Sequence, residues 1–176
     1  NITVVVAAGN GDDQGHPQDA CTYSPASASA SSAVISVGAT DKKDKMAPFS
    51  NYGECVTLLA PGVNLVSISH KSPTGVLTLS GTSFAAPLVA GFAALIMADN
   101  GEPMSPAEVK AQVLNYSTPN AISGLKPATP NNLLFGNLIA AKSGLDSSDG
   151  GPHLLRQSWP TTGAFVVLSL VALLFV

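Results

Sequence analysis

Residues 79–91, LSGTSFAAPLVAG, place a small polar cluster directly in front of an apolar run. A helix on a protein surface carries a polar face, yet residues 84–98 contain no polar side chain at all. We therefore expect a helix over residues 83–99 that is buried on every side. Asn100 and Gly101 mark its end, because glycine just past the last helical turn is a common stop signal.

The beginning of this helix is a candidate catalytic position. The first turn of a helix has unpaired N–H groups and the positive end of the helix dipole, and together these bind anions. Gly81 and Thr82 let the chain turn tightly into the helix and hold Ser83 at its mouth. Ser83 is a candidate nucleophile, because the oxyanion formed by its attack would lie against its own backbone N–H. The alternative is that Ser83 serves only as the helix N-cap.

A second candidate group follows the apolar stretch VVVAAGN, residues 4–10. The β-branched run predicts a fully buried, parallel strand over residues 3–8. Asn10 would then project from the carboxyl end of that strand, where α/β folds place their sites. Its carboxamide could complete an oxyanion hole, although Asn-Gly is also a common turn dipeptide. Beside the Ser83 motif, the catalytic interpretation is favoured.

The remaining pattern alternates short strands with helices and predicts an α/β layer fold. We expect a loop over residues 9–32 and a second helix over residues 105–116. That helix begins with a capping box in which Ser105 is the N-cap and Glu108 its partner. Further strands are expected at residues 33–38, 56–60, 65–69 and 76–80.

The composition narrows the class of protein and its partners. Only 11% of the 176 residues are charged and the net charge is −3, so no basic stripe predicts nucleic-acid binding. Cys21 and Cys55 are either free thiols or, in an exported protein, a disulfide. The histidines His16, His70 and His153 lack partners at metal-ligand spacing, so we expect no zinc-type cluster.

Both ends of the sequence carry information. The chain begins inside an expected strand, which indicates a sheet cut partway through. Residues 142–162 form a small-residue and polar linker, and residues 163–176 form an apolar tail. About 14 apolar residues are fewer than the roughly 20 that span a bilayer. Small residues at 147–150, a spacer and an apolar tail match the signal for a lipid anchor. The alternative is a short terminal or membrane helix.

Four blocks in order resemble one family of enzymes. SGTSFAAPLVAG is similar to the active-site serine motif of subtilisin-like serine peptidases, and VVVAAGN to their oxyanion-hole strand. Residues 23–53 and the block LLAPGVNLVS resemble the proteinase K and aqualysin branch. The resemblance implies that residues 1–141 are the incomplete C-terminal half of a parallel-sheet α/β domain with a buried central helix. It also implies a secreted enzyme that acts on proteins or peptides.

The resemblance assigns a role to individual residues. It implies that no cofactor is required for the chemistry. The resemblance also implies a structural calcium site, but this chain lacks one of its ligands, because Thr57 stands where many relatives have an aspartate. The implied roles are the nucleophile for Ser83, the oxyanion hole for Asn10, the turn at the nucleophile for Gly81 and Thr82, the flank of the specificity pocket for Ala7, Ala8 and Gly9, and a disulfide between Cys21 and Cys55.

Two members of the family's catalytic triad have no counterpart in this sequence. The aspartate and histidine motifs lie far upstream of the oxyanion strand in the family, and only nine residues precede Asn10. His16 and His70 have no such motif around them. We therefore expect the C-terminal portion of a serine endopeptidase that is inactive without its N-terminal half. The alternative is a non-catalytic, surface-anchored remnant that acts as a binding module.

Overall fold

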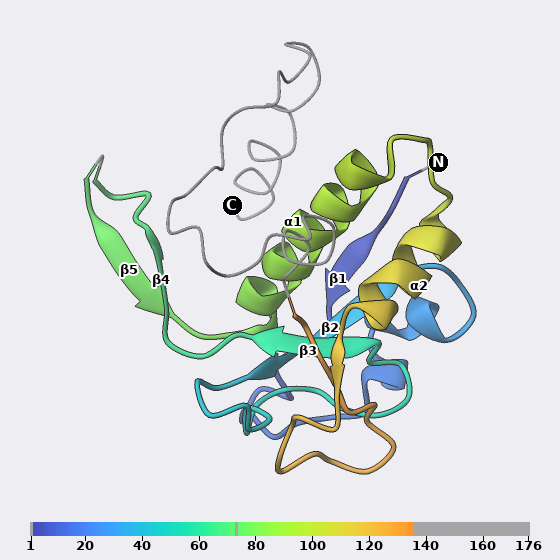
Figure 1. The fold of residues 1–176 in the computed structure, drawn as a ribbon. Helices are drawn as coiled ribbons and strands as arrows, with labels where there is room; N and C mark the ends of the chain where they lie inside the picture. Colours follow the sequence, from blue (N-terminus) through green and yellow to red (C-terminus); the bar gives the residue numbers. More distant parts are fainter. Residues whose placement is uncertain (1, 73, 136–176) are drawn as a thin grey trace, which may run out of the picture. The chain divides into compact units, whose positions relative to one another are not determined.

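The computed structural model describes residues 2–72 and 74–135, and its centre is a mixed β-sheet. The sheet order is β1-β2-β3-β7-β6, in which β1 to β3 and β7 run parallel and β6 runs antiparallel to β7 (Figure 1). The predicted parallel sheet is confirmed, but the sequence did not reveal its two shortest strands. The five strands are Val5–Ala7 (β1), Ile35–Thr40 (β2), Leu58–Pro61 (β3), Thr118–Pro119 (β6) and Asn132–Leu133 (β7).

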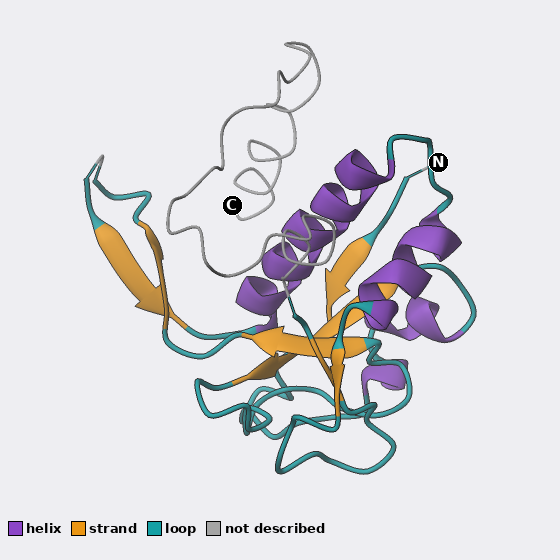
Figure 2. Cartoon of the chain, viewed as in Figure 1, coloured by secondary structure: helices purple, strands orange, loops and turns teal. Residues whose placement is uncertain are grey.

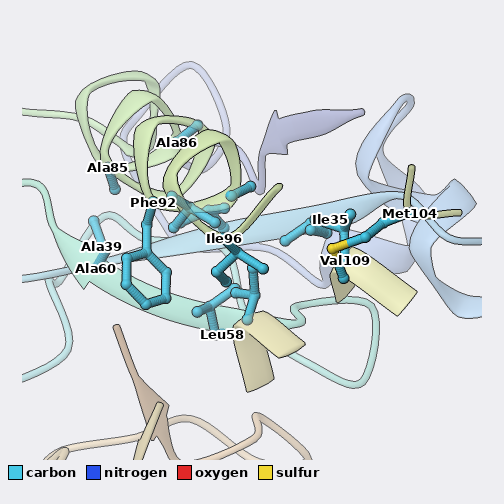
Figure 3. Packing of buried hydrophobic residues seen from close by; sticks show 14 of the residues in the cluster. Ile35, Ala39, Leu58, Ala60, Ala85, Ala86, Phe92, Ile96, Met104 and Val109 are labelled. Atoms are coloured by element: carbon cyan, nitrogen blue, oxygen red, sulfur yellow. The ribbon is translucent and has the colours of Figure 1, made fainter. Parts of the chain in front are cut away.

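Two helices follow, α1 at Thr82–Asn100 and α2 at Pro106–Asn115 (Figure 2). Helix α1 packs on β1, β2 and β3, and α2 packs against α1 and adds Val109 and Val113 to the same core. Both lie within one residue of the ranges that the sequence predicts. Phe92 and Ile96 of α1 point towards Leu58 of β3, as Figure 3 shows, and Phe92 also makes an edge-to-face contact with Tyr116 beyond α2. The apolar face of α1 packs on the sheet and forms the main core with it. This packing holds the first turn of α1 in place relative to the strands.

The expectation that α1 is buried on every side is wrong. The side chains of Leu88, Leu95 and Met97 are 42%, 55% and 40% exposed. The sheet covers one face of the helix, and no other described residues cover the opposite face. By length and composition alone α1 could also cross a membrane, but its contacts with β1, β2 and β3 are those of a core helix.

Strand β1 is also less buried than predicted. Its three residues are only half-buried, and Val4 just before it is 43% exposed. The reason is its place in the sheet, because β1 is an edge strand that pairs with β2 alone. The parallel direction of β1 is as predicted, with Val6 opposite Ser36.

The expected loop over residues 9–32 contains two short 3₁₀ helices, η1 at Ala20–Thr22 and η2 at Ala26–Ala30. Alanine and serine alternate in η2 without a helical apolar period, so no helix is predictable there from the sequence. Lys110 of α2 ties η2 to the helical layer, because its Nζ donates to the carbonyls of Ser29 and Ser32, both at 3.0 Å. Partial burial lowers the pKa of this lysine.

The remaining predicted elements are present, although β2 and β3 each begin two residues later than predicted. Strands β4 (Leu65–Ile68) and β5 (Val76–Leu79) form a separate antiparallel hairpin between β3 and α1 (Figure 1). The capping box of α2 is present, because Ser105 Oγ accepts from Glu108 N–H and Glu108 Oε2 accepts from Ser105 N–H. The hydroxyl of Ser105 also donates to Glu108 Oε2 at 2.7 Å, and this bond, followed by that of the Ser105 N–H, lowers the pKa of Glu108. The linker at 142–162 and the tail at 163–176 lie outside the described residues, so the anchor signal stays a prediction.

Candidate active site

The carboxamide of Asn10 is fixed at one end and free at the other. Its Oδ1 accepts hydrogen bonds from the backbone N–H and the hydroxyl of Thr82, both at 2.8 Å. Thr82 Oγ1 in turn accepts from Gly9 N–H at 3.2 Å. With Oδ1 occupied by Thr82, the Nδ2 end of Asn10 makes no hydrogen bond within the described part of the chain. The end of β1 therefore presents an amide donor whose orientation is set by the first residue of α1.

Gly81 allows this donor to lie against the turn that leads into α1. A Cβ built on Gly81 would lie 3.3 Å from Asn10 Nδ2, tighter than an ordinary van der Waals contact. Gly81 N–H donates to the carbonyl of Gly62 at 2.8 Å, which fixes the turn to the end of β3. A Cβ on Gly62 would lie only 2.7 Å from Ala39 Cβ and 2.9 Å from Gly81 O, so glycine is needed there too.

Ser83 is the second residue of α1 and is half-buried. The N-cap of α1 is Gly81, which has no side chain to cap the helix, so the interpretation of Ser83 as the N-cap is wrong. Phe84 N–H bonds to Gly81 O and Thr82 N–H bonds to Asn10. Within the described residues, neither Ser83 Oγ nor Ser83 N–H has a protein acceptor. The first turn carries no acidic side chain, so the positive helix end is not neutralised locally.

The residues expected to flank a specificity pocket lie beside Asn10. Ala7 ends β1 and is half-buried, Ala8 is fully buried, and Gly9 has a φ of 106°. Ala8 packs with Ala20, Val56 and other residues of the second, smaller core. Their contact with a substrate side chain stays a prediction from the resemblance.

The predicted disulfide is present. Cys21 of η1 is bonded to Cys55, with 5.2 Å between the Cα atoms and a sequence separation of 34. No free cysteine remains, so the alternative of two free thiols is wrong for this structure.

The histidines are not part of this arrangement. His16 Nδ1 lies 3.5 Å from Asp12 Oδ2 in an exposed loop, and the hydrogen bond from the backbone N–H of His16 is the largest cause of the lowered pKa of Asp12. His70 lies between β4 and β5. Neither makes a hydrogen bond to Ser83. The described residues therefore supply an unpaired amide donor on Asn10 and an unpaired hydroxyl on Ser83, but no general base bonded to that hydroxyl.

The residues around Thr57 do not fit a calcium ion. Thr57 is buried, its Oγ1 already accepts from Ser36 N–H at 3.1 Å, and its N–H donates to Ser36 O at 2.8 Å. Calcium takes six to eight oxygen ligands, usually with carboxylates among them. Among the described residues there is no group of three acidic, histidine or cysteine side chains that could hold a metal.

Two residues that hold the candidate site together have no recognisable sequence signal. The sequence identifies Thr82 only as a turn residue, but its N–H and its hydroxyl both donate hydrogen bonds to Asn10, 72 positions away in the sequence. Asn51, in the stretch FSNYG, was not singled out, yet its side chain contacts the backbone on both sides of Asn10. A buried asparagine in a loop has no periodic signal, and only the packing reveals its partners.

Comparison with known proteins identifies the class to which this arrangement belongs. Residues 1–142 match the sequence profile described as the Subtilase family. The chain belongs to the subtilase family.

Several relatives carry names that describe secreted or subtilisin-like proteases. An extracellular serine proteinase of Thermus sp. (strain Rt41A) is 44% identical over 134 residues, covering 76% of this chain and 30% of that protein. Cerevisin of Saccharomyces cerevisiae is 39% identical, covering 76% of this chain and 22% of that protein. The chain thus spans less than a third of the length of these two relatives.

A solved structure confirms the fold. The crystal structure of a cold adapted subtilisin-like serine proteinase matches with a TM-score of 0.65 and 36% sequence identity. The match covers 74% of this chain and 43% of that one, so the described α/β fold corresponds to part of a subtilisin-like domain.

Proposed function

We propose that this sequence is the C-terminal part of the catalytic domain of a secreted serine endopeptidase. The observation that carries the proposal is the geometry of Asn10. Its Oδ1 is tied to Thr82, so its Nδ2 is free beside the unneutralised N-terminus that bears Ser83. The disulfide supports export, because disulfides persist in oxidising compartments.

In the proposed reaction, Ser83 Oγ attacks the carbonyl carbon of the scissile peptide and its proton passes to a histidine supplied upstream. Asn10 Nδ2 and Ser83 N–H donate to the oxyanion of the tetrahedral intermediate. The C–N bond then breaks, the histidine returns the proton to the leaving amine, and an acyl-serine remains. Water, deprotonated by the same histidine, releases the acid product and restores Ser83. An upstream aspartate orients the histidine.

The proposed partner within the same protein is the N-terminal half of the domain. Two unpartnered surfaces support this. Among the described residues, one is the outer edge of β1, and the other is the exposed face of α1 on which Leu88 and Leu95 lie two turns apart. Additional strands and helices would cover both surfaces and would bring the histidine and aspartate to Ser83. Proteins and peptides are the proposed substrates, and Ala7, Ala8 and Gly9 are proposed to flank the pocket for the side chain before the scissile bond.

The test begins with the full-length transcript, sequenced through its 5′ end. We expect in-frame aspartate and histidine motifs upstream of residue 1. The encoded protein, expressed whole, should react with a fluorophosphonate probe, and mass spectrometry should locate the label on Ser83. A message that starts near residue 1, together with no labelling, would instead support the non-catalytic remnant that acts as a binding module.

Removing the amide donor should slow the chemistry without weakening substrate binding. In Asn10→Ala we expect kcat for a peptide anilide to fall about 10²- to 10³-fold, the usual cost of one oxyanion donor. KM should change little, because the donor acts mainly on the transition state. Steady-state kinetics of the full-length enzyme checks this. Asn115→Ala, an exposed amide at the end of α2, is the matched control and should keep full activity.

We also propose that the position of Thr57 binds no calcium in this protein. The test compares thermal melting with and without EDTA in the wild type and in Thr57→Val. Loss of the bond to Ser36 N–H should lower the melting temperature of Thr57→Val, but the shift caused by EDTA should be the same in both proteins. A smaller EDTA shift in Thr57→Val would show that the hydroxyl helps to bind the ion.

A further inference from the structure

We propose that Asn51 is a positioning residue for the oxyanion hole. It holds the backbone segment 8–11 that presents Asn10, and so sets where the free amide donor lies. The inference rests on the proposed function and extends it to a residue that does not touch the substrate.

Asn51 brackets Asn10 through the backbone on both sides. Before Asn10, Asn51 Nδ2 donates to Ala8 O at 3.0 Å and Asn51 N–H donates to Gly9 O at 3.0 Å. After Asn10, Asn51 Oδ1 accepts from Gly11 N–H at 2.9 Å. The same oxygen accepts from Gln18 N–H at 2.9 Å, so all the hydrogen bonds of this amide go to backbone groups.

The surroundings of Asn51 leave it little freedom. Its side chain is fully buried, so any of these bonds that is lost leaves an unsatisfied polar group. Gly9 has a φ of 106°, and a Cβ at that position would overlap Asn51 Nδ2. Gly9 thus provides the space in which the amide of Asn51 lies against the end of β1.

Asn51 is itself anchored from its own side of the fold. Ser50 Oγ donates to Asn51 O at 3.1 Å and accepts from Ala39 N–H of β2 at 3.0 Å. The next residue, Tyr52, exchanges backbone bonds with the loop that follows Asn10, because its N–H donates to Gln18 O and its carbonyl accepts from Ala20 N–H. We call Asn51 and its hydrogen bonds to residues 8–11 and Gln18 the clamp. The clamp connects the segment bearing Asn10 to the central sheet.

Two different contacts thus fix the donor. Thr82 determines which way the carboxamide of Asn10 faces, and Asn51 determines where its backbone lies. An oxyanion donor must lie about 2.7–3.1 Å from the oxyanion, so a small shift of segment 8–11 weakens it. Misplacement by about 1 Å can cost on the order of 10² in rate.

The test uses Asn51→Asp in the full-length enzyme. The substitution keeps the shape and the acceptor for Gly11, but it puts an oxygen opposite Ala8 O in place of a donor. We expect kcat for a peptide anilide to fall about 10- to 100-fold with KM nearly unchanged. Binding of a peptide aldehyde, which forms an oxyanion adduct with the serine, should weaken by a similar factor. Rates are normalised to the fraction of enzyme that a fluorophosphonate titrates.

A double-mutant cycle separates positioning from general support of the fold. Because Asn51 acts through Asn10, adding Asn51→Asp to Asn10→Ala should lower kcat less than about threefold further. Asn131→Asp is the matched control. Asn131 forms the same kind of clamp on Ile122, with its Nδ2 on Ile122 O and its Oδ1 on Ile122 N–H, far along the chain from Asn10. It should lower stability and leave kcat unchanged.

Each outcome decides the matter. Equal losses from Asn51→Asp in both backgrounds, or an unchanged kcat in Asn51→Asp, would overturn the positioning role while the peptidase function stands. A wild-type enzyme that is inert towards both anilide and fluorophosphonate would overturn the proposed function and this inference with it. If Asn51→Asp does not fold, Asn51→Ser is carried through the same cycle, since it retains a hydroxyl that can donate and accept.

Discussion

Ser83→Ala in the full-length protein is expected to lower kcat by a factor on the order of 10⁶. The substitution removes the only proposed nucleophile but leaves the oxyanion donors, Asn10 Nδ2 and the backbone N–H at position 83. Those donors and substrate binding alone sustain a rate about 10³- to 10⁴-fold above the uncatalysed reaction. KM should remain close to that of the wild type, because the hydroxyl contributes mainly to the covalent step. Hydrolysis of a peptide anilide, followed over hours, measures the residual rate.

The same variant should leave the fold intact. Ser83 Oγ makes no hydrogen bond within the described residues, and the side chain is only half-buried. The melting temperature of Ser83→Ala should therefore match that of the wild type. Ser123→Ala, at an exposed position outside the helices and strands, should retain full activity. A Ser83→Ala enzyme that still cleaves the anilide at an appreciable fraction of the wild-type rate would assign the nucleophile elsewhere.

The helices were predictable because residues close in sequence determine where each helix begins and ends. Gly81 before α1, the Asn100-Gly101 stop signal after it and the capping box at Ser105 each act within a few residues. The exposure of Leu88 and Leu95 was not predictable, because an apolar side chain does not reveal what covers it. Strands β6 and β7, of two residues each, are too short to show any period.

The candidate site likewise has residues that the sequence predicts and contacts that it does not. Ser83 and Asn10 stand out because each ends a strong local pattern, an apolar helix in one case and an apolar strand in the other. The contacts that orient them were hidden, since Thr82 and Asn10 are 72 residues apart and Asn51 and Gly11 are 40 apart. Pairings of that kind depend on how β1, β2 and α1 assemble, and no short window of sequence contains them.

The Cys21–Cys55 bond should make a large contribution to stability. The bond closes a loop with a sequence separation of 34. In the chain-entropy model, this loop lowers the conformational entropy of the unfolded chain and so raises the unfolding free energy by about 4 kcal/mol. We therefore expect the Cys21→Ser/Cys55→Ser variant of the full-length protein to lose up to about 4 kcal/mol of unfolding free energy. Urea denaturation measures the loss. Reduction with dithiothreitol should destabilise the wild type by a similar amount and leave the variant unchanged.

The two cysteines lie close in sequence to residues of the clamp that positions Asn10. We therefore ask whether loss of the disulfide would change the turnover rate or only the stability. Cys55 follows Asn51 by four residues, and Cys21 follows Gln18, whose N–H bonds to Asn51 Oδ1. The hydrogen bonds of Asn51 do not involve either cysteine, so kcat per folded enzyme should be almost unchanged in the double variant. Activity should instead disappear at a lower temperature, in step with unfolding. A variant that keeps the wild-type melting temperature, or a wild type whose two cysteines react with a thiol reagent under native conditions, would show that the bond does not form in solution.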